Sequence, residues 1–378
     1  MASVDKVTTG YRVRWRTPDG KSRSKTVKRK VDADQFLRSI EHSKDTGTYM
    51  DPSRSKITVG AWSEQWLASQ AHLKPTAKAR YQGILNAHIV PRWGSTPLHA
   101  VNHADVQKWV SSTTQVLQPA SVRLAHHVFR TIMDLAVRDK RIPSNPATGV
   151  RLPRATKPEK RFLSVDELHR LADCAAQYPH PEVGAPYRVL ILLLGYTGLR
   201  WGEVVALRVK RVDLLRRRLT VAESAVEVTG RLQWGTPKSH ASRSVPIPRS
   251  VADLLLDVVA GKSPDDLVFT TWRGKPLRNE NFRRAVFNKA AADAGLEGLT
   301  PHELRHTAAS LAVSAGANVK AVQRMLGHAS AAMTLDVYSG LFDDDLDGVA
   351  ERMDSLRGVS EMCHDAAVVP LRLGETAP

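Results

Sequence analysis

The chain has 378 residues, enough for two or three domains that each bury a core. Its 55 Lys and Arg against 38 Asp and Glu give a net charge of +17, which favours a polyanionic partner, nucleic acid first and an anionic membrane surface second. The two cysteines are far apart and lack metal-ligand spacing, which excludes a disulfide framework and a zinc finger. The longest apolar run, Val189–Leu194, is too short to span a membrane. We therefore expect a soluble, unprocessed protein of a reducing cytoplasm.

The first fifty residues predict a small, basic β-sheet domain. Residues 11–31 alternate in side-chain character around the turn dipeptide Asp19-Gly20, and a helix is expected through Asp34–Glu41. Residues 1–30 hold ten Lys or Arg and two Asp, which is nearly half of the net charge. Interleaved aromatic residues favour contact with phosphates over a merely solvated face. The candidate DNA-binding residues are Arg12, Arg14, Arg16, Lys21, Arg23 and Lys25.

The middle of the chain predicts a helical domain. A polar linker over residues 51–56 precedes it, and residues 59–152 have helical patterns with short breaks. Its clearest helix runs from Ala120 to Arg141, with apolar residues at i, i+4 and i+7. Residues 151–161 are basic and contain two prolines, which favours an extended, charged connector.

The third segment predicts helices around a small sheet. Ser164–Glu167 has the capping-box pattern, so a helix begins at about Val165. Val189–Leu194 is a fully buried helix or strand, and Arg200 stands at the start of a helix over 201–207. Leu219–Pro248 indicates a short antiparallel sheet, and helices return from residue 300. The expected fold is therefore a multi-domain α+β chain with a small N-terminal β-sheet domain, a helical domain, and a mostly helical third domain with an antiparallel sheet.

Thr300-Pro-His-Glu303 combines an N-cap threonine, a proline at N1 and a glutamate at N3. This pattern predicts that His302 and Arg305 lie within the first turns of one helix, on the same face. Such a pair at the positive end of a helix suits an anionic oxygen.

The segment His302–His306 also reads H-E-x-x-H, the signature of helical zinc proteases. That alternative would make both histidines ligands and needs a third. The following residues lack the known extension, and a cationic Arg305 beside zinc is unfavourable. We therefore expect no metal.

Several separated segments resemble, in order and spacing, the tyrosine recombinases of the phage integrase type. They are Thr197–Glu203, Thr236–Lys238 followed by Arg243–Pro246, His302–Thr307, Leu326–His328, and Tyr338. The resemblance spans about residues 160–345. The layout before it is similar to that of integrases with an arm-binding and a helical core-binding domain.

The resemblance implies six catalytic residues: Arg200, Lys238, His302, Arg305, His328 and Tyr338. Tyr338 would attack a scissile phosphate to leave a 3′-phosphotyrosine, the two arginines would clamp the non-bridging oxygens, and Lys238 would be the general acid. The resemblance makes His302 the expected proton acceptor for Tyr338, and Glu203 a supporting residue that orients Arg200. It implies no cofactor.

The resemblance also implies an organisation: an arm-type DNA-binding domain over 1–50, a core-binding domain over 58–152, a catalytic domain over 160–358 with a C-terminal helix over 341–357, and a tail over 359–378. The implied partners are double-stranded DNA with core and arm-type attachment sites, three further protomers in a synaptic tetramer, a host DNA-bending protein and a directionality factor. The implied setting is the cytoplasm of a bacterial host.

The alternatives are a chromosome-dimer-resolving recombinase, a type IB topoisomerase and a non-catalytic DNA-binding relative. The basic N-terminal module argues against the first two. The retention of Tyr338 with both arginines argues against the third.

Overall fold

The computed structural model of the chain describes residues 3–17, 20–46, 49–51, 53–155, 160–237 and 242–338. The chain divides into two compact units, residues 1–158 and 159–378. Among the described residues, each unit contains two clusters of buried apolar side chains. The mixed α+β, multi-domain prediction is confirmed. No helix in the described ranges is both long and apolar enough to cross a membrane.

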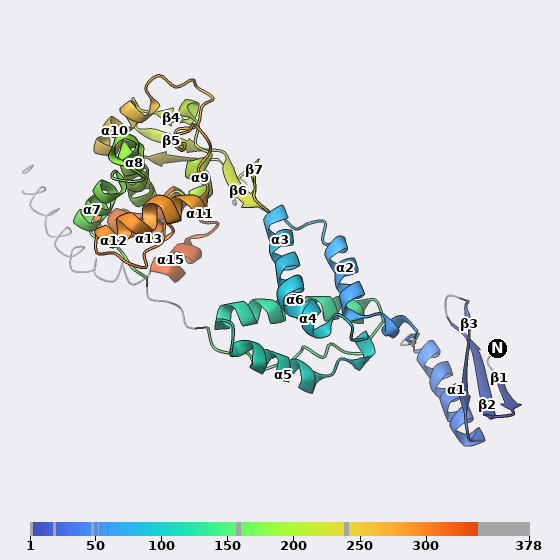
Figure 1. Ribbon diagram of the computed structural model, residues 1–378. Helices are drawn as coiled ribbons and strands as arrows, with labels where there is room; N and C mark the ends of the chain where they lie inside the picture. The colour runs from blue at the N-terminus through green and yellow to red at the C-terminus, as the bar shows by residue number, and fades with distance from the viewer. Residues whose placement is uncertain are drawn as a thin grey trace, which may run out of the picture. The chain divides into compact units, whose positions relative to one another are not determined.

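The first unit begins with a three-stranded antiparallel sheet covered on one face by a helix (Figure 1). The elements are β1 (Ser3–Val7), β2 (Gly10–Arg16), β3 (Ser22–Val27) and α1 (Lys30–Asp45). Val13 and Trp15 point toward the helix and are buried, because alternate residues of a strand face opposite sides. The prediction placed sheet and helix correctly but missed β1; Asp19 of the predicted turn lies outside the described residues.

A helical region follows in the same unit, as predicted. Its elements are η1 (Arg54–Lys56), α2 (Val59–Ser69), α3 (Pro75–Ile84), η2 (Leu85–Ile89), α4 (Val90–Trp93), η3 (Leu98–Ala100), α5 (His103–Thr114) and α6 (Pro119–Arg138). The apolar stripe of α6 lies in a core with Trp62, Trp93 and Trp109. This helix ends at Arg138, three residues before the predicted end, and Lys140 beyond it has a positive φ of 53°.

The second unit surrounds a buried helix, α8 (Pro181–Thr197). Val189–Leu194, left open between helix and strand by the sequence, is thus helical. The other helices are α7 (Val165–Ala175), α9 (Trp201–Val205), η4 (Val209–Arg211), α10 (Arg249–Val259), α11 (Asn279–Phe282), η5 (Arg283–Phe287), α12 (Asn288–Asp293), α13 (Glu303–Ser314), α14 (Val319–Leu326) and α15 (Ala331–Tyr338). The predicted capping box of Ser164 and Glu167 begins α7.

The antiparallel strands of this unit form two small sheets. One has the order β4 (Val212–Asp213), β5 (Arg218–Val221) and β8 (Arg243–Pro246), and the other pairs β6 (Ser224–Val228) with β7 (Arg231–Gly235). Thr229 and Gly230 connect β6 to β7 with positive φ at both residues, the backbone that a tight hairpin needs. Lys238, predicted on a turn between β7 and β8, lies outside the described residues.

Candidate active site

Arg200 is placed by the sharp end of the buried helix α8. Gly198 closes that helix in the left-handed conformation, with φ of 63°. A Cβ atom at this position would lie 2.4 Å from Leu326 Cδ2, so both the backbone and the close approach of α14 require glycine. The chain then turns, and Arg200 becomes the N-cap residue of α9, as the sequence indicated.

Glu203 holds two arginines at the base of the site. It accepts hydrogen bonds from the Arg200 backbone N–H and from Arg200 Nη1, both at 3.0 Å. Arg243, on β8, donates from Nη1 and Nη2 to its two carboxylate oxygens at 2.9 and 2.6 Å. Burial alone would raise the pKa of Glu203, but the hydrogen bonds and charges of Arg243 and Arg200 outweigh it and hold that pKa below its ordinary value. The carboxylate therefore stays ionised.

Three arginines converge on the C-terminal end of α14. Arg243 Nε donates to the carbonyl of Met325 at 3.0 Å. Arg305 Nη2 donates to Leu326 O at 2.7 Å, and Arg200 Nη2 to Gly327 O at 3.4 Å. The last carbonyls of a helix have no partner within it and carry its negative dipole end, so cations are stabilised there. This helix end brings together side chains that are far apart in the sequence.

Arg305 is the most buried of these arginines, with 4% of its surface exposed. Its second hydrogen bond goes from Nη1 to the carbonyl of Gly198 at 2.5 Å. Burial, and then the positive charge of Arg200, lower the pKa of Arg305 to about 9. The guanidinium is therefore still charged at neutral pH, in a setting where an arriving anion would be strongly attracted.

Tyr338 is the last described residue of α15 and is 2% exposed. Its hydroxyl lies 2.9 Å from Nδ1 of His306. Burial raises the pKa of this phenol, and the charge of Arg305 offsets that effect only in part. The hydroxyl is thus protonated at neutral pH and needs a base to become a nucleophile.

The two other histidines flank this pair. His302 is the N-cap residue of α13, not a residue inside the helix as predicted, and its ring centroid lies 5.2 Å from that of His306. Burial, then the charges of Arg305 and Arg200, lower the pKa of His302. His328 directly follows the C-cap of α14; its Nδ1 lies 2.9 Å from Thr334 Oγ1, and its ring is parallel to that of Tyr338 with centroids 6.4 Å apart.

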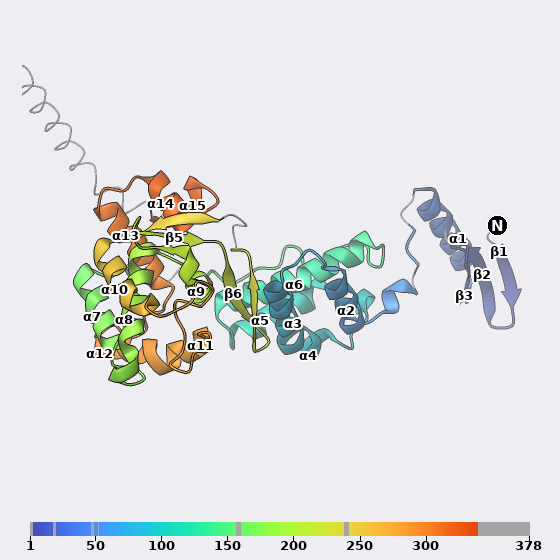
Figure 2. The ribbon, with the colours of Figure 1, turned by 90° about the horizontal axis from the view of Figure 1, so that it is seen from above.

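Figure 2 shows α14 and α15 side by side in the second unit, and the two helices pack against each other. Lys160, at the start of the second unit, donates from Nζ to the carbonyl of Val337 in the last turn of α15. The same ammonium lies 5.9 Å from the centroid of the Tyr338 ring. A cation at a helix C-terminus is stabilising, so Lys160 fixes the end of the helix that carries Tyr338.

The structure gathers the predicted residues other than Lys238 into one site: Arg200, Glu203, His302, Arg305, His328 and Tyr338. The resemblance makes His302 the expected proton acceptor for Tyr338, whereas the hydrogen bond of the Tyr338 hydroxyl is to His306. Three residues of the site, Arg243, His306 and Lys160, were not predicted from the sequence. Arg243 and His306 lie within the sequence motifs, whereas Lys160 gave no signal beyond its place in a basic connector.

The six N-terminal basic candidates do not share one surface. Strand pairing places Arg12, Arg14 and Arg16 opposite small hydroxyl residues of β3, on the face turned away from α1. Arg23 and Lys25 lie on the helix side: Arg23 Nη2 is 2.8 Å from Asp51 Oδ2, and Lys25 Nζ lies 4.4 Å from the centre of the Phe36 ring. Lys21 precedes β3.

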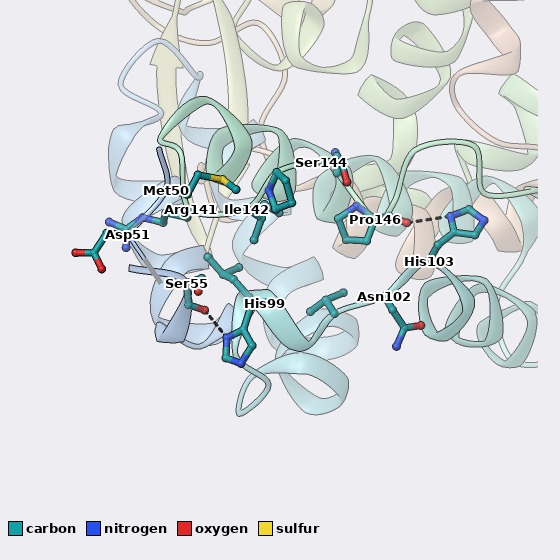
Figure 3. A pocket seen from close by; sticks show the side chains of 14 residues that line it. Met50, Asp51, Ser55, His99, Asn102, His103, Arg141, Ile142, Ser144 and Pro146 are labelled. Atoms are coloured by element: carbon teal, nitrogen blue, oxygen red, sulfur yellow. Dashed lines mark hydrogen bonds between the residues drawn. The ribbon is translucent and has the colours of Figure 1, made fainter. Parts of the chain in front are cut away.

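A pocket in the first unit is lined by two histidines that bind backbone carbonyls (Figure 3). His99 Nδ1 is 3.0 Å from the carbonyl of Ser55, and His103 Nδ1 is 3.1 Å from that of Pro146. The first ring thus joins η3 to η1, and the second joins the start of α5 to the chain at Pro146. Across the described ranges, no group of three or more His, Cys, Asp or Glu side chains is arranged to hold a metal ion.

Two family models match the chain. The model of the phage integrase family matches residues 161–344, which include every residue of the site described above except Lys160, and that of the phage integrase N-terminal SAM-like domain matches residues 58–113. The integrase of Mycobacterium phage D29 is 29% identical over 88% of this chain and 89% of its own length. The tyrosine recombinase XerC of Salmonella typhi is 28% identical over 73% of this chain and 89% of its own.

Solved structures show the same fold. The Tn1549 transposon integrase, in complex with transposon right end DNA, has a TM-score of 0.67 with 22% identity, over 79% of this chain and 99% of that one. A lambda integrase tetramer bound to a Holliday junction has a TM-score of 0.60 with 19% identity, over 86% and 95%. The chain belongs to the phage integrase family and is a tyrosine-type DNA recombinase.

Proposed function

We propose that the chain integrates and excises DNA, of a phage or a related element, between attachment sites. Tyr338 attacks a backbone phosphate, a 3′-phosphotyrosine forms, and the 5′-hydroxyl of the partner strand later displaces the tyrosine. The observation that carries this proposal is the convergence of Arg200, Arg305 and His328 at the end of α14, beside Tyr338 on α15. The phosphotyrosine conserves the energy of the phosphodiester bond, so the reaction needs no cofactor.

The hydrogen-bond acceptors of the arginines in the absence of DNA suit this chemistry. Arg200 Nη2 and both amino groups of Arg305 donate to neutral backbone carbonyls. The non-bridging oxygens of a phosphate carry more negative charge, which increases further in the pentavalent transition state. We infer that these donors move from carbonyl to phosphate oxygens, while Glu203 and Arg243 keep Arg200 in place.

Lys238 completes the reaction in this proposal as the general acid for the departing 5′-oxygen. The assignment comes from the family pattern. Replacing Lys238 with alanine should spare DNA binding and slow cleavage, and a substrate with sulfur in place of the 5′-bridging oxygen should restore the rate, because a thiolate leaves without protonation. Slow cleavage of the sulfur substrate would remove Lys238 from this role.

We propose that the N-terminal domain, residues 1–50, binds arm-type DNA, and that the domains over 58–152 and 160–358 each bind core-site DNA. The arm surface is the open face of the sheet, where Arg12, Arg14 and Arg16 alternate with buried residues. A sheet face of this kind can enter a DNA groove. The separate core of this module favours a phage-type integrase over a chromosome-dimer-resolving enzyme, which has no need of arm sites.

The proposed assembly is a tetramer on two DNA sites, in the cytoplasm of a bacterial host. The solved lambda integrase structure is a tetramer bound to a Holliday junction, which supports a tetramer here. A host protein that bends DNA would bring arm and core sites together, and a directionality factor would select excision. The C-terminal helix expected over 341–357 lies outside the described residues.

The experiment is incubation with nicked core-site DNA in EDTA, followed by denaturing electrophoresis. The wild type should give a covalent protein–DNA band, and Tyr338→Phe should give none. A band from both proteins would contradict the nucleophile assignment, and no band from either on several attachment-site candidates would favour a DNA-binding relative without activity. Relaxation of supercoils without strand exchange would indicate a topoisomerase.

A further inference from the structure

The hydroxyl of Tyr338 has a specific hydrogen-bond partner that the family pattern does not assign. Nδ1 of His306 lies 2.9 Å from Tyr338 Oη, and the two ring centroids are 5.6 Å apart at an angle of 62°. His306 projects from α13, one turn after His302, and its ring contacts the rings of both His302 and Tyr338. It therefore lies where a group must lie to accept the proton of the attacking hydroxyl.

The neighbouring histidines are placed differently. His328 uses Nδ1 for the Thr334 hydroxyl and stacks on the tyrosine ring. His302 lies within the electrostatic influence of Arg305 and Arg200, the residues proposed to hold phosphate. Thus His306 lies beside the phenol hydroxyl, His302 beside the expected phosphate site, and His328 beside the face of the tyrosine ring.

We propose that His306 is a further catalytic residue, which accepts the Tyr338 hydroxyl proton as the phenol attacks the scissile phosphate. The proposal rests on the proposed function. The Tyr338 Oη–H bond breaks and the proton moves to Nδ1, the Oη–P bond forms, and the P–O5′ bond breaks as the leaving oxygen receives a proton from its own acid. During religation the imidazolium returns the proton to the departing phenolate, so His306 is regenerated.

The charges around His306 favour this role. Burial, then the charges of His302, Lys160 and Arg305, lower the pKa of His306 to about 4, and Glu303 opposes them weakly. The ring is therefore neutral at pH 7 and can accept a proton. A bound phosphate would neutralise part of this cationic field, which makes the protonated ring easier to form when the reaction needs it.

The test compares His306→Asn with His306→Ala. An asparagine amide occupies nearly the place of Nδ1, so His306→Asn retains a hydrogen bond to Tyr338 and loses only the base. The matched control is His169→Asn, because Nε2 of His169 lies 3.0 Å from the hydroxyl of Tyr196 in the same unit, outside the site. Single-turnover formation of the covalent complex on nicked core-site DNA is followed from pH 3.5 to pH 9, a range that includes the pKa of His306, with DNA affinity and Tm measured in parallel.

We expect both His306 variants to form the complex at least about 10²-fold more slowly than the wild type, with unchanged DNA affinity, and the control to match the wild type. The wild-type rate should fall at acid pH as His306 becomes protonated, and His306→Asn should lose that limb. The proposal would be overturned if His306→Asn kept the rate and pH profile of the wild type. It would also be overturned if His302→Asn, instead of His306→Asn, lost the acid limb. A faster reaction in His306→Ala would also overturn it, since His306 would then only restrain the tyrosine. No complex with the wild type would instead refute the proposed function itself.

Discussion

Glu203 binds Arg243 through both of its carboxylate oxygens, at 2.9 and 2.6 Å, in a pair that is almost fully buried. The same carboxylate binds Arg200 at 3.0 Å. Arg243 also reaches the end of α14, so a single acidic residue aligns the start of α9, strand β8 and the helix end where the arginines meet. The role expected of Glu203, orienting Arg200, thus extends to a second arginine.

Replacing Glu203 with glutamine should destabilise the second unit. The change leaves the buried charge of Arg243 without its counter-charge, a loss of about 3–5 kcal/mol in the free energy of unfolding. Urea unfolding measures it, and Asp253→Asn is the control because its pair with Arg249 is exposed and should change stability little. A loss no larger than that of the control would show that the pair is unimportant.

The same pair predicts a pH dependence. The pKa of Glu203 is lower in the fold than its ordinary value of 4.5, so its stabilising effect is complete above pH 4.5 and is lost as pH falls through the folded pKa. The stability difference between the wild type and Glu203→Gln should therefore shrink on acidification. A difference that grows below pH 4.5 would contradict this sign.

Phosphate-like anions should stabilise the protein. Arg305 is buried and charged, and its guanidinium donates to two neutral backbone carbonyls. Arg200 lies close enough to repel it, so an anion that binds here relieves their repulsion. Vanadate at 100 times its Kd should add about 2.7 kcal/mol of stability. Thermal unfolding in vanadate, against chloride at equal ionic strength, measures the effect. If vanadate stabilised Arg200→Ala as much as the wild type, the anion would bind elsewhere.

Lys160 should affect the rate of cleavage without affecting DNA affinity. Replacing it with methionine removes the cation at the end of α15 and loosens the helix that carries Tyr338. We expect faster hydrogen exchange in residues 331–338 and slower formation of the covalent complex. Lys289→Met is the control, because Lys289 lies over the ring of Tyr178 at 5.4 Å, away from the site. Equal effects of the two variants would contradict a specific role.

The open face of the N-terminal sheet should account for arm-site binding. The triple change of Arg12, Arg14 and Arg16 to alanine should weaken binding of arm DNA and lower the salt slope of log K by about 0.9 for each lost phosphate contact. Lys25→Ala should leave the slope unchanged, since Lys25 lies over Phe36 on the opposite face. Filter binding over a range of salt concentrations distinguishes the two. A larger effect of Lys25→Ala would move the DNA to the helix side.

Local patterns predicted most of the fold. The capping box of Ser164, the buried run in α8 and the stripe of α6 depend on short-range spacing, and all three are present. The missed strand β1 has no strong alternation of its own and is formed by pairing with β2. Helix α13, which contains Arg305, begins later than its capping pattern indicated, because His302 and not Thr300 is the N-cap residue.

The site was predictable as a set of residues but not as a network. Motif order singled out Arg200, Arg305 and Tyr338, and the structure places both arginines at the end of α14 and Arg305 close enough to influence the Tyr338 hydroxyl. Which histidine meets the phenol depends on the rotation of α13 against α15, and that packing is tertiary. The same holds for Lys160, whose contact joins residues 177 apart in sequence.

The most direct test of the central claim is to map the covalent linkage. The complex with nicked core-site DNA is digested with nuclease and trypsin, and the nucleotide-bearing peptide is sequenced by mass spectrometry. The account predicts a nucleotide joined through its 3′-phosphate to Tyr338, with a free 5′-hydroxyl on the released strand. Linkage to another residue, or through a 5′-phosphate, would contradict it.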